Sequence, residues 1–340
     1  MKTILIEEPG RVIQTKRDKP RVKDGEIMLR NKYVGFCGSD LSTYLGKNPM
    51  VRYPRVPGHE ISGTIEETGT GVPEGFSQGE AVTVIPYTSC GLCSACRNGR
   101  NNACRFNQTL GVQRDGAMQE YITVPWEKVI KAPGLSDLEL AVVEPLTVGF
   151  HAIDRGRVTD SDVVMVLGCG MIGAGAIIRA SLRGARVIAV DVDDYKLTLA
   201  GQLGAHTSIN SSATGLAGEL EEITGGNGPD VVIEAAGRPM TYLSAIEQVS
   251  FTGRVVCIGY TNSEVSFATK LFVQKELDIL GSRNANQADF RAVIAYMGNH
   301  GFPMESMITA KVKPENVPEA MKNWSDHPGR TMKLLLDLTE

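Results

Sequence analysis

Residues 163–191 read VVMVLGCGMIGAGAIIRASLRGARVIAVD, and the order of residue types in this stretch decides the fold. The apolar, mostly β-branched run at 163–167 is typical of a parallel strand that is buried on both faces. Glycines follow it, then residues 174–184 predict a helix, and residues 186–190 predict a second strand. The stretch therefore predicts one strand–helix–strand unit of a doubly wound parallel sheet in an α/β protein.

The glycines between the first strand and the helix predict a site for a dinucleotide. They permit a tight turn and close approach of a pyrophosphate, whose charge is favoured by the amide groups at the start of the helix. Asp191 ends the second strand, 18 residues after Gly173. A carboxylate at that distance binds both ribose hydroxyls and repels a 2′-phosphate, so NAD is favoured over NADP. The expected cofactor residues here are Gly168, Gly170, Met171, Ile172, Gly173 and Asp191.

The alternation of strands and helices continues as far as residue 281. Apolar runs at 231–234, 254–259 and 277–281 predict strands, and residues 196–203 predict a helix. Ligands of such sheets bind beyond the carboxyl ends of the strands. The backbone at these ends is therefore expected beside the cofactor, at Ala236, Gly237, Ile258, Gly259 and Ser282. We assign residues 146–289 to this dinucleotide-binding domain.

The chain before residue 145 has a different pattern, with short apolar runs between Gly and Pro residues and no helical period before residue 138. Residues 138–152 predict two helical pieces separated by Pro145. The strand-like run at 333–338 is expected to return to the first part of the chain. We therefore predict a β-rich domain from residues 1–145 and 290–340, with strands at 3–6, 26–30, 33–34, 61–66, 81–85 and 121–124.

Four cysteines in this β-rich part have the spacing C-x2-C-x2-C-x7-C within a polar loop. Four thiolates complete a tetrahedral shell around zinc and leave no open position, so such a site is structural. Two disulfides or a redox-active pair are the alternatives, but all seven cysteines are expected to be reduced in the cytosol. We predict a structural zinc lobe at about residues 88–106, with Cys90, Cys93, Cys96 and Cys104 as ligands.

A catalytic metal site is expected around residues 34–60, VGFCGSDLSTYLGKNPMVRYPRVPGHE. Cys37 and His59 offer a thiolate and an imidazole, and a catalytic zinc takes three protein ligands plus one open position. Glu144 lies in an apolar segment, where an unpaired carboxylate is costly, so it is the expected third ligand. Glu60 is the substitute. A hydrogen-bonded helix carboxylate is the alternative interpretation of Glu144.

Two further side chains near Cys37 favour a metal site over an isolated buried thiol and a structural imidazole. Asp40 is placed to accept the free ring N–H of His59 and so to fix the tautomer of a metal-bound imidazole. Ser39 supplies a hydroxyl that could pass a proton. Both are therefore expected catalytic residues, together with the metal ligands.

Length, charge and hydropathy restrict the class of protein. The length of 340 residues predicts two domains. The net charge of −4 and the lack of a basic block predict that the protein binds neither nucleic acid nor anionic membranes. The first residues lack the apolar core of a signal peptide, and no apolar run has the length of a membrane span. We expect a cytoplasmic protein that acts on a small polar molecule.

The sequence resembles the zinc-dependent medium-chain dehydrogenases through CGSD at 37–40, GHE at 58–60, the four-cysteine lobe, the glycine motif and Asp191, in this order. The resemblance covers essentially the whole chain. It implies a GroES-like catalytic domain interrupted by a Rossmann domain, NAD-dependent oxidation of an alcohol, two zinc ions per chain, and a dimer or tetramer. It also implies that Thr147 packs near the cofactor. The pair Glu144-Pro145 resembles the sorbitol and threonine dehydrogenase branch.

Within this branch, YPRVPGHE, VIPYTSCGLC, GVQRDGAMQEY and GSRNA most resemble bacterial dehydrogenases that act on L-galactonate or L-gulonate at carbon 5. A sugar acid calls for an arginine and amides in the cleft. The expected substrate contacts are Arg114, Gln119, Arg283 and Asn284, and a solvated surface charge is the alternative for each arginine.

Four alternatives and one departure from the family pattern accompany this interpretation. Sorbitol-like polyols, butanediol and threonine are alternative substrates, and a dinucleotide-binding regulatory protein without turnover is the alternative that is not an enzyme. Many relatives carry a histidine two residues after the aspartate of CGSD, and this chain has Ser42 there. The outer end of a proton relay would then be Ser42, Tyr44 or water.

Overall fold

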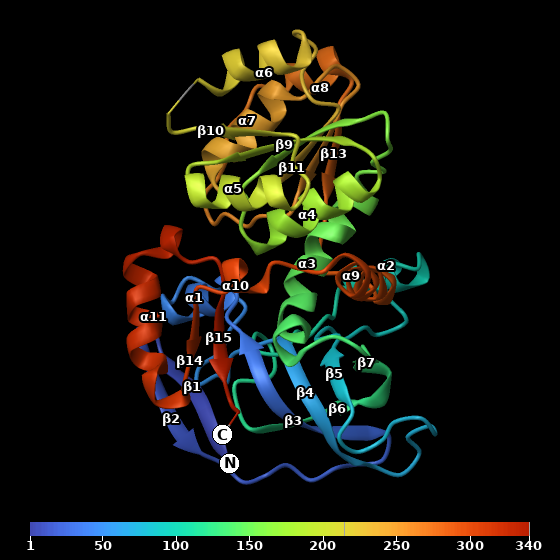
Figure 1. Ribbon diagram of the computed structural model, residues 1–340, viewed down its shortest axis with the longest axis vertical. Helices are drawn as coiled ribbons and strands as arrows, with labels where there is room; N and C mark the ends of the chain where they lie inside the picture. Colours follow the sequence, from blue (N-terminus) through green and yellow to red (C-terminus); the bar gives the residue numbers. More distant parts are fainter. Residues whose placement is uncertain (214, 340) are drawn as a thin grey trace. The chain divides into compact units, whose positions relative to one another are not determined.

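The computed structural model describes residues 1–213 and 215–339, which form two compact units. One unit consists of Met1–Glu144 together with Asn286–Glu340, and the other of Pro145–Ala285. Figure 1 shows the course of the chain through each of them. In the described ranges, no helix is both long enough and apolar enough to cross a membrane.

The unit Pro145–Ala285 is built on a six-stranded sheet with the order β10-β9-β8-β11-β12-β13. Every pair of neighbouring strands in it is parallel. The chain order reverses between β8 and β11, which makes the carboxyl ends of these strands the expected ligand-binding edge. The strands are β8 (Val163–Leu167), β9 (Arg186–Asp191), β10 (Thr207–Asn210), β11 (Val231–Glu234), β12 (Arg254–Cys257) and β13 (Asp278–Gly281).

Helices connect these strands and lie against the sheet (Figure 1). They are α4 (Met171–Leu182), α5 (Asp194–Gln202), α6 (Leu216–Thr224), α7 (Pro239–Gln248) and α8 (Lys270–Lys275). The helix α4 starts directly after the glycine loop, and Gly173 is required there. A Cβ atom on Gly173 would lie 1.9 Å from the carbonyl oxygen of Gly168, so only glycine lets the helix approach the strand end so closely. The predicted doubly wound sheet is confirmed.

The unit that holds the chain termini contains a seven-stranded sheet. Its order is β14-β15-β3-β4-β5-β7, and β6 pairs with β3. β15 pairs antiparallel with β3, so the last strand returns to the first part of the chain as expected. The strands are β3 (Glu26–Gly35), β4 (Glu60–Thr68), β5 (Ala81–Val84), β6 (Tyr121–Pro125), β7 (Val129–Lys131), β14 (Ala310–Val312) and β15 (Leu334–Asp337), beside the hairpin of β1 (Lys2–Glu8) and β2 (Arg11–Lys16).

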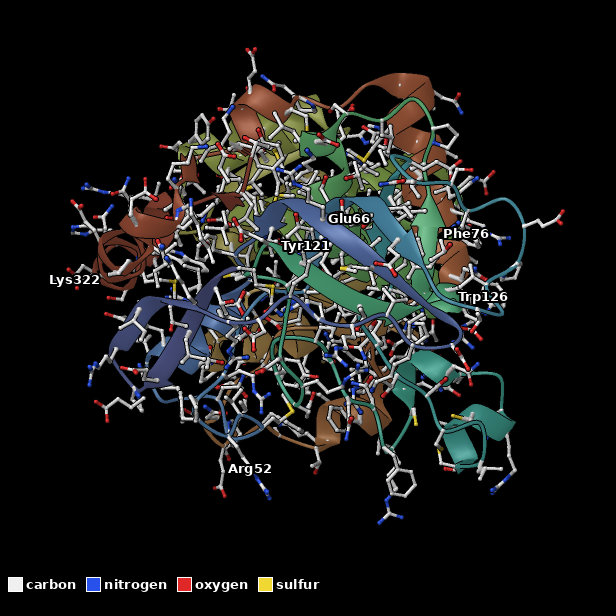
Figure 2. All side chains as sticks on the ribbon, turned by 90° about the horizontal axis from the view of Figure 1, so that it is seen from below. Arg52, Glu66, Phe76, Tyr121, Trp126 and Lys322 are labelled. Atoms are coloured by element: carbon white, nitrogen blue, oxygen red, sulfur yellow. The ribbon has the colours of Figure 1, made fainter. Side chains whose placement is uncertain are left out.

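Short helices and surface contacts complete this unit. Lys19 bridges Glu66 and the ring of Tyr121. Phe76 packs on Trp126, and Figure 2 shows these two residues close together. The α-helices are α1 (Gly38–Tyr44), α2 (Ser94–Arg97), α9 (Gln287–His300), α10 (Met304–Met307) and α11 (Val317–Asp326). The 3₁₀-helices are η1 (Asn101–Ala103), η2 (Trp126–Lys128), η3 (Pro314–Asn316) and η4 (Pro328–Arg330).

Two helical expectations were wrong. Residues 138–152 belong to one helix, α3 (Asp137–Arg155), which continues through Pro145. The part after the proline is held by packing on α4, where Gly149 and Gly175 let the two backbones touch. Such tertiary contacts override the cost of an internal proline. The helix α1 was not predicted, because seven residues are too few to show a helical period.

Candidate active site

Three potential metal ligands come together at the end of β3 and the start of β4. One ligand atom each from Cys37, His59 and Glu60 lies within 4.8 Å of the others. The antiparallel register pairs Gly35 with Glu60, which brings the start of α1 beside His59. His59 and Glu60 are buried, and Cys37 is half-buried. The structure therefore gathers the thiol, the imidazole and a carboxylate that the sequence predicts for this site.

Glu60 forms a buried ion pair with Lys333, which precedes β15. The Lys333 ammonium donates to both carboxylate oxygens of Glu60, at 2.7 and 2.6 Å, and to the carbonyl of Phe36 at 3.0 Å. Gly35 makes room for this carboxylate, because a Cβ atom there would lie 1.8 Å from Glu60 Oε2. Lys333 was not predicted at this site, because no local pattern indicates a contact between residues so far apart in the sequence.

Glu144 is buried in α3 and accepts a hydrogen bond from the hydroxyl of Tyr87. Burial raises the pKa of Tyr87 well above its usual value, and the charge of Glu144 raises it further, so the tyrosine remains a donor. The negative charge of Glu144 also acts on His59, which it helps to keep protonated. Tyr87 lies in the quoted motif VIPYTSCGLC, but no pattern there indicated its contact with a candidate ligand.

The predicted hydrogen bond from His59 to Asp40 is not formed. Asp40 instead accepts from the backbone N–H groups of Cys37 at 2.9 Å and Gly58 at 3.2 Å. It is the third residue of α1 and completes the cap of that helix, so its oxygens are directed at the backbone. Asp40 thereby ties the two loops that carry Cys37 and His59, and it contributes charge rather than a direct bond.

The environment of His59 is that of a cation site. Burial disfavours a charged imidazole, but Cys37, Glu144 and Asp40 raise the pKa of His59 well above its usual value. Its Nδ1 atom is buried and has no hydrogen-bond partner among the described residues. Sulfur, nitrogen and oxygen donors around an excess of negative charge fit zinc, which binds all three kinds of ligand. The hydroxyl oxygen of Ser39 is also buried without a partner in the described part of the chain.

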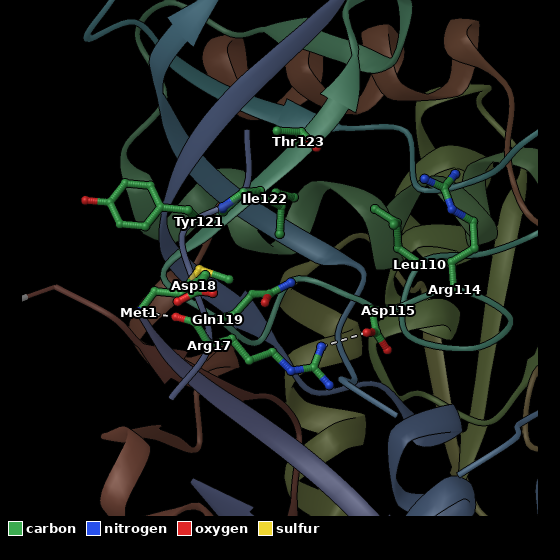
Figure 3. Close-up of a pocket in the computed structure, with 11 residues that line it drawn as sticks. Met1, Arg17, Asp18, Leu110, Arg114, Asp115, Gln119, Tyr121, Ile122 and Thr123 are labelled. Atoms are coloured by element: carbon green, nitrogen blue, oxygen red, sulfur yellow. Dashed lines mark hydrogen bonds and ion pairs between the residues drawn. The ribbon is translucent and has the colours of Figure 1, made fainter. Parts of the chain in front are cut away.

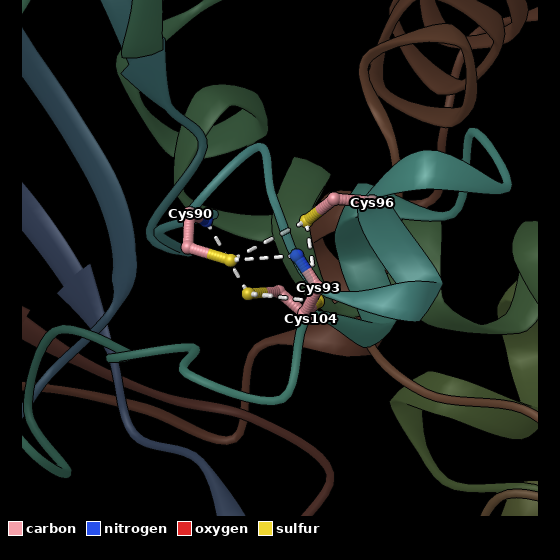
Figure 4. Close-up of side chains that lie close together, drawn as sticks. All are labelled: Cys90, Cys93, Cys96 and Cys104. Carbon is pink, nitrogen blue, oxygen red and sulfur yellow. Dashed lines mark hydrogen bonds between the residues drawn. The ribbon is translucent and has the colours of Figure 1, made fainter.

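The four cysteines of the predicted lobe converge on one point (Figure 4). Sγ–Sγ distances are 4.0 Å for Cys90–Cys96, 3.6 Å for Cys93–Cys96 and 3.8 Å for Cys93–Cys104. A tetrahedron with Zn–S bonds of about 2.3 Å has edges of roughly 3.8 Å, so the spacing fits one zinc ion. Hydrogen bonds from backbone N–H groups lower the pKa of Cys93 to about 6, which favours a thiolate ligand.

The residues expected at a dinucleotide lie at the carboxyl edge of the six-stranded sheet. The carboxylate of Asp191 accepts hydrogen bonds from the backbone N–H of Cys169 at 2.7 Å and of Val192 at 2.8 Å, so it borders the glycine loop. Thr147 is fully buried in α3. The remaining expected residues follow strand ends, namely Ala236 and Gly237 after β11, Ile258 and Gly259 after β12, and Ser282 after β13.

The expected substrate residues divide between the two units. Arg114 and Gln119 line a pocket of about 270 Å³ in the unit that holds the termini, together with Arg17 and Asp115 (Figure 3). None of the candidate metal ligands lines it. Gln119 is buried and donates to the carbonyl of Gly116. The other two, Arg283 and Asn284, follow β13 in the second unit and are half-buried.

Comparison with known proteins agrees with this geometry. Residues 23–134 match the alcohol dehydrogenase GroES-like domain, and residues 172–299 match the zinc-binding dehydrogenase domain. A zinc-type alcohol dehydrogenase-like protein of Haemophilus influenzae is 34% identical over 335 residues, 98% of each chain. The L-galactonate-5-dehydrogenase of Escherichia coli K12 is 31% identical over 309 residues, 91% of each chain.

A solved structure extends the likeness to three dimensions. The alcohol dehydrogenase of Escherichia coli CFT073, complexed with the cofactor NADH, superposes with a TM-score of 0.91 at 33% identity and covers 99% of each chain. Relatives of this similarity over the full length show the family. The chain belongs to the zinc-dependent medium-chain dehydrogenases, oxidoreductases with a GroES-like unit and a Rossmann unit that use zinc and a nicotinamide cofactor.

Proposed function

We propose that this protein oxidises a secondary hydroxyl of a sugar acid or polyol to a ketone with NAD⁺, and that L-gulonate or L-galactonate, oxidised at carbon 5, is its substrate. The observation that carries the proposal is the group of Cys37, His59 and Glu60, with the buried carboxylate of Glu144 acting on His59 through its charge. It lies apart from the four-cysteine lobe, and a purely structural role needs no second site. The L-galactonate-5-dehydrogenase relative supports the substrate class. Sorbitol-like polyols, butanediol and threonine are the alternatives.

We assign the catalytic zinc to Cys37, His59 and Glu144. Lys333 occupies both oxygens of Glu60 and compensates its charge, whereas Glu144 accepts a hydrogen bond from the neutral hydroxyl of Tyr87. Glu144 is therefore the preferred third ligand, and Glu60 is the substitute ligand. Zinc bound there would act as a Lewis acid toward the substrate hydroxyl. A second, structural zinc belongs to the four-cysteine lobe.

We assign proton transfer to Ser39. It lies in the first turn of α1, two residues after Cys37, and its buried hydroxyl oxygen has no other partner among the described residues. A hydroxyl can accept a proton while donating its own, so Ser39 can carry the substrate proton outward. Ser42 is half-buried near the end of the same helix. With Tyr44 and water, it is a candidate for the outer end of this path.

The nicotinamide cofactor is proposed to be NAD. The carboxylate of Asp191 lies beside the glycine loop, where it would accept hydrogen bonds from the ribose hydroxyls. A 2′-phosphate at the same place would meet a negative charge and lose affinity. The carboxyl ends of β11, β12 and β13 would border the rest of the dinucleotide.

The proposed contacts for the anionic end of a sugar acid are Arg283 with the amide of Asn284 in one unit, and Arg114 with the amide of Gln119 in the other. Arginine binds a carboxylate through two parallel hydrogen bonds. Such a contact would favour hexonates over neutral polyols, which have no carboxylate. Arg283→Ala should then abolish hexonate oxidation while a neutral polyol is still turned over. Equal loss of both activities would show that Arg283 does not bind the carboxylate of the substrate specifically.

We further propose a cytoplasmic homo-oligomer, either a dimer or a tetramer. β13 is the edge strand of the six-stranded sheet, and three of its four residues are exposed. Apolar side chains are exposed on it and on the neighbouring helix α8, among them Ile279 and Val273. An exposed, partly apolar edge strand is a template for pairing with a second copy. Light scattering should show more than one chain per particle, and Ile279→Lys should reduce the mass.

The function is tested by NADH formation with zinc-loaded protein across hexonates, neutral polyols and amino alcohols. A preference for L-gulonate or L-galactonate over sorbitol and threonine is expected. Preference for a neutral substrate would be consistent with the proposed oxidation of a secondary hydroxyl, but it would contradict the assignment of a sugar acid as the substrate. Metal analysis separates the regulatory alternative, because an enzyme should hold two zinc ions per chain and a regulator without a catalytic site only one.

A further inference from the structure

Glu234, the last residue of β11, is a fully buried carboxylate that no part of the proposed chemistry uses. One of its oxygens, Oε1, accepts three hydrogen bonds, from Ala236 N at 3.0 Å, Gly237 N at 2.7 Å and the Thr241 hydroxyl at 2.7 Å. The other oxygen, Oε2, is buried without a partner among the described residues. Burying a carboxylate costs free energy unless it is hydrogen-bonded. The three hydrogen bonds offset that cost and hold the three donor residues in place around Oε1.

The same residue also holds the next strand end. Its main-chain carbonyl accepts from Ile258 N at 2.9 Å and Gly259 N at 3.1 Å, directly after β12. Glu234 therefore bonds the turn at 235–237 through its side chain and the turn at 258–259 through its backbone. Its side chain has 0% exposure, so it acts on a bound molecule only through these turns.

The two turns are packed without space for side chains. A Cβ atom on Gly259 would lie 2.3 Å from Gly237 N and 2.7 Å from Glu234 Oε2. A Cβ atom on Gly237 would lie 2.7 Å from the carbonyl oxygen of Tyr260. The relative position of the two turns is thus fixed by backbone contact, with the Glu234 carboxylate beneath them.

We propose that Glu234 is a positioning residue for the nicotinamide cofactor, which fixes the turns after β11 and β12 in the arrangement that binds the dinucleotide. This inference rests on the proposed cofactor site. The accepting oxygen Oε1 carries the role, because the side-chain hydrogen bonds that Glu234 makes with described residues all end on it. A glutamine, whose amide keeps one acceptor oxygen in the same place, should therefore replace Glu234, whereas alanine should not.

The test is a fluorescence titration of NADH without substrate, on the zinc-loaded wild type, Glu234→Ala, Glu234→Gln and Gly259→Ala. Glu247→Gln, an exposed change on α7, is the matched control. We expect Glu234→Ala and Gly259→Ala to raise the Kd for NADH at least about tenfold, and Glu234→Gln to stay within about threefold of wild type. The KM for NAD⁺ should follow the same order, and the zinc content should not change.

Two results would overturn the inference. Wild-type affinity for NADH in Glu234→Ala would show that the turns need no support from this carboxylate. A Kd for NADH raised equally in Glu234→Gln and Glu234→Ala would show that the position of the acceptor oxygen does not carry the role. Thermal unfolding identifies a variant that fails to fold. In that case Thr241→Val, which removes one of the three hydrogen bonds to Oε1 and leaves Glu234 in place, decides the question: a raised Kd for NADH supports the inference, and a wild-type Kd overturns it. A wild type that binds no NADH would overturn the cofactor assignment itself, a distinct outcome.

Discussion

The ammonium of Lys333 is bonded to both oxygens of the Glu60 carboxylate, across 273 residues of sequence and in the interior of the molecule. The side chains of Lys333 and Glu60 are 4% and 1% exposed. Removing one partner of such a pair leaves an uncompensated buried charge, which costs far more than the pair itself contributes. Lys333, directly before β15, therefore stabilises the start of β4 beside His59 through a buried ion pair.

Lys333→Met should reduce the free energy of unfolding by about 3–5 kcal/mol, because Glu60 would remain buried without its counter-charge. Adding Glu60→Gln should restore most of this loss, since no lone charge remains. Urea unfolding of the two single variants and the double variant measures the coupling. Lys322→Met is the control, because its ion pair with Asp326 is exposed to solvent and should contribute little to stability. A Lys333→Met protein of wild-type stability would contradict the assignment.

The sequence predicted what depends on local order. The strand, glycine loop, helix and second strand at 163–191 follow one another along the chain, and so do the four cysteines at 90–104. The partners of Glu60 and Glu144 were not predicted, because Lys333 and Tyr87 reach them only through sheet pairing and packing. Nothing in the local sequence distinguishes such residues from an ordinary strand lysine or core tyrosine.

The choice between Glu144 and Glu60 as zinc ligand is open to direct measurement. We expect Glu144→Ala to lower the zinc content from two ions per chain to one, because the catalytic site would lose a ligand while the four-cysteine lobe stays filled. Glu60→Gln should keep both ions, since this change leaves the three proposed ligands, Cys37, His59 and Glu144, in place. Elemental analysis after dialysis gives the counts. The opposite result would make Glu60 the ligand.

Removal of the Ser39 hydroxyl should slow proton release and leave zinc and NADH bound. We expect kcat of Ser39→Ala to fall roughly 100-fold near neutral pH and to recover partly at high pH, where hydroxide can take the substrate proton. The pH profile of kcat is the measurement, with Thr43→Val as a buried neighbour that changes a hydroxyl outside the proposed path. Turnover equal to wild type at every pH would exclude the relay.

Asp191 should decide between NAD and NADP. Replacing it with alanine removes charge-assisted hydrogen bonds to the ribose, so kcat/KM for NAD⁺ should fall roughly 10- to 100-fold. The value for NADP⁺ should hold or rise, because the repulsion of the 2′-phosphate is lost. Asp193→Ala is the control, since among the described residues that carboxylate caps α5 through Tyr195 N and Lys196 N. An unchanged ratio of the two cofactors would contradict the role of Asp191.

Asp115 should make the unit that holds the termini sensitive to acid. Burial opposes its ionisation, but hydrogen bonds from Arg17 and from Val56 N, with the charges of Arg17 and Arg55, lower the pKa of Asp115 below its usual value. A carboxyl with a lowered pKa in the folded state stabilises that state above its unfolded pKa of about 3.9, and this stability is lost as the pH falls through the folded value.

We therefore expect Asp115→Asn to lower the stability at pH 7 and to flatten the decline of stability below about pH 5. Because the Asp115 side chain is 41% exposed, water screens its ion pairs, and the loss at pH 7 should be at most about 1 kcal/mol. Urea unfolding at a series of pH values measures both effects. Asp18→Asn is the control, since Asp18 lines the same pocket and makes no ion pair with any described residue. If Asp115→Asn kept the wild-type slope in acid, the Arg17 and Arg55 pairs would not be the cause, because a lowered pKa must appear as a change in that slope.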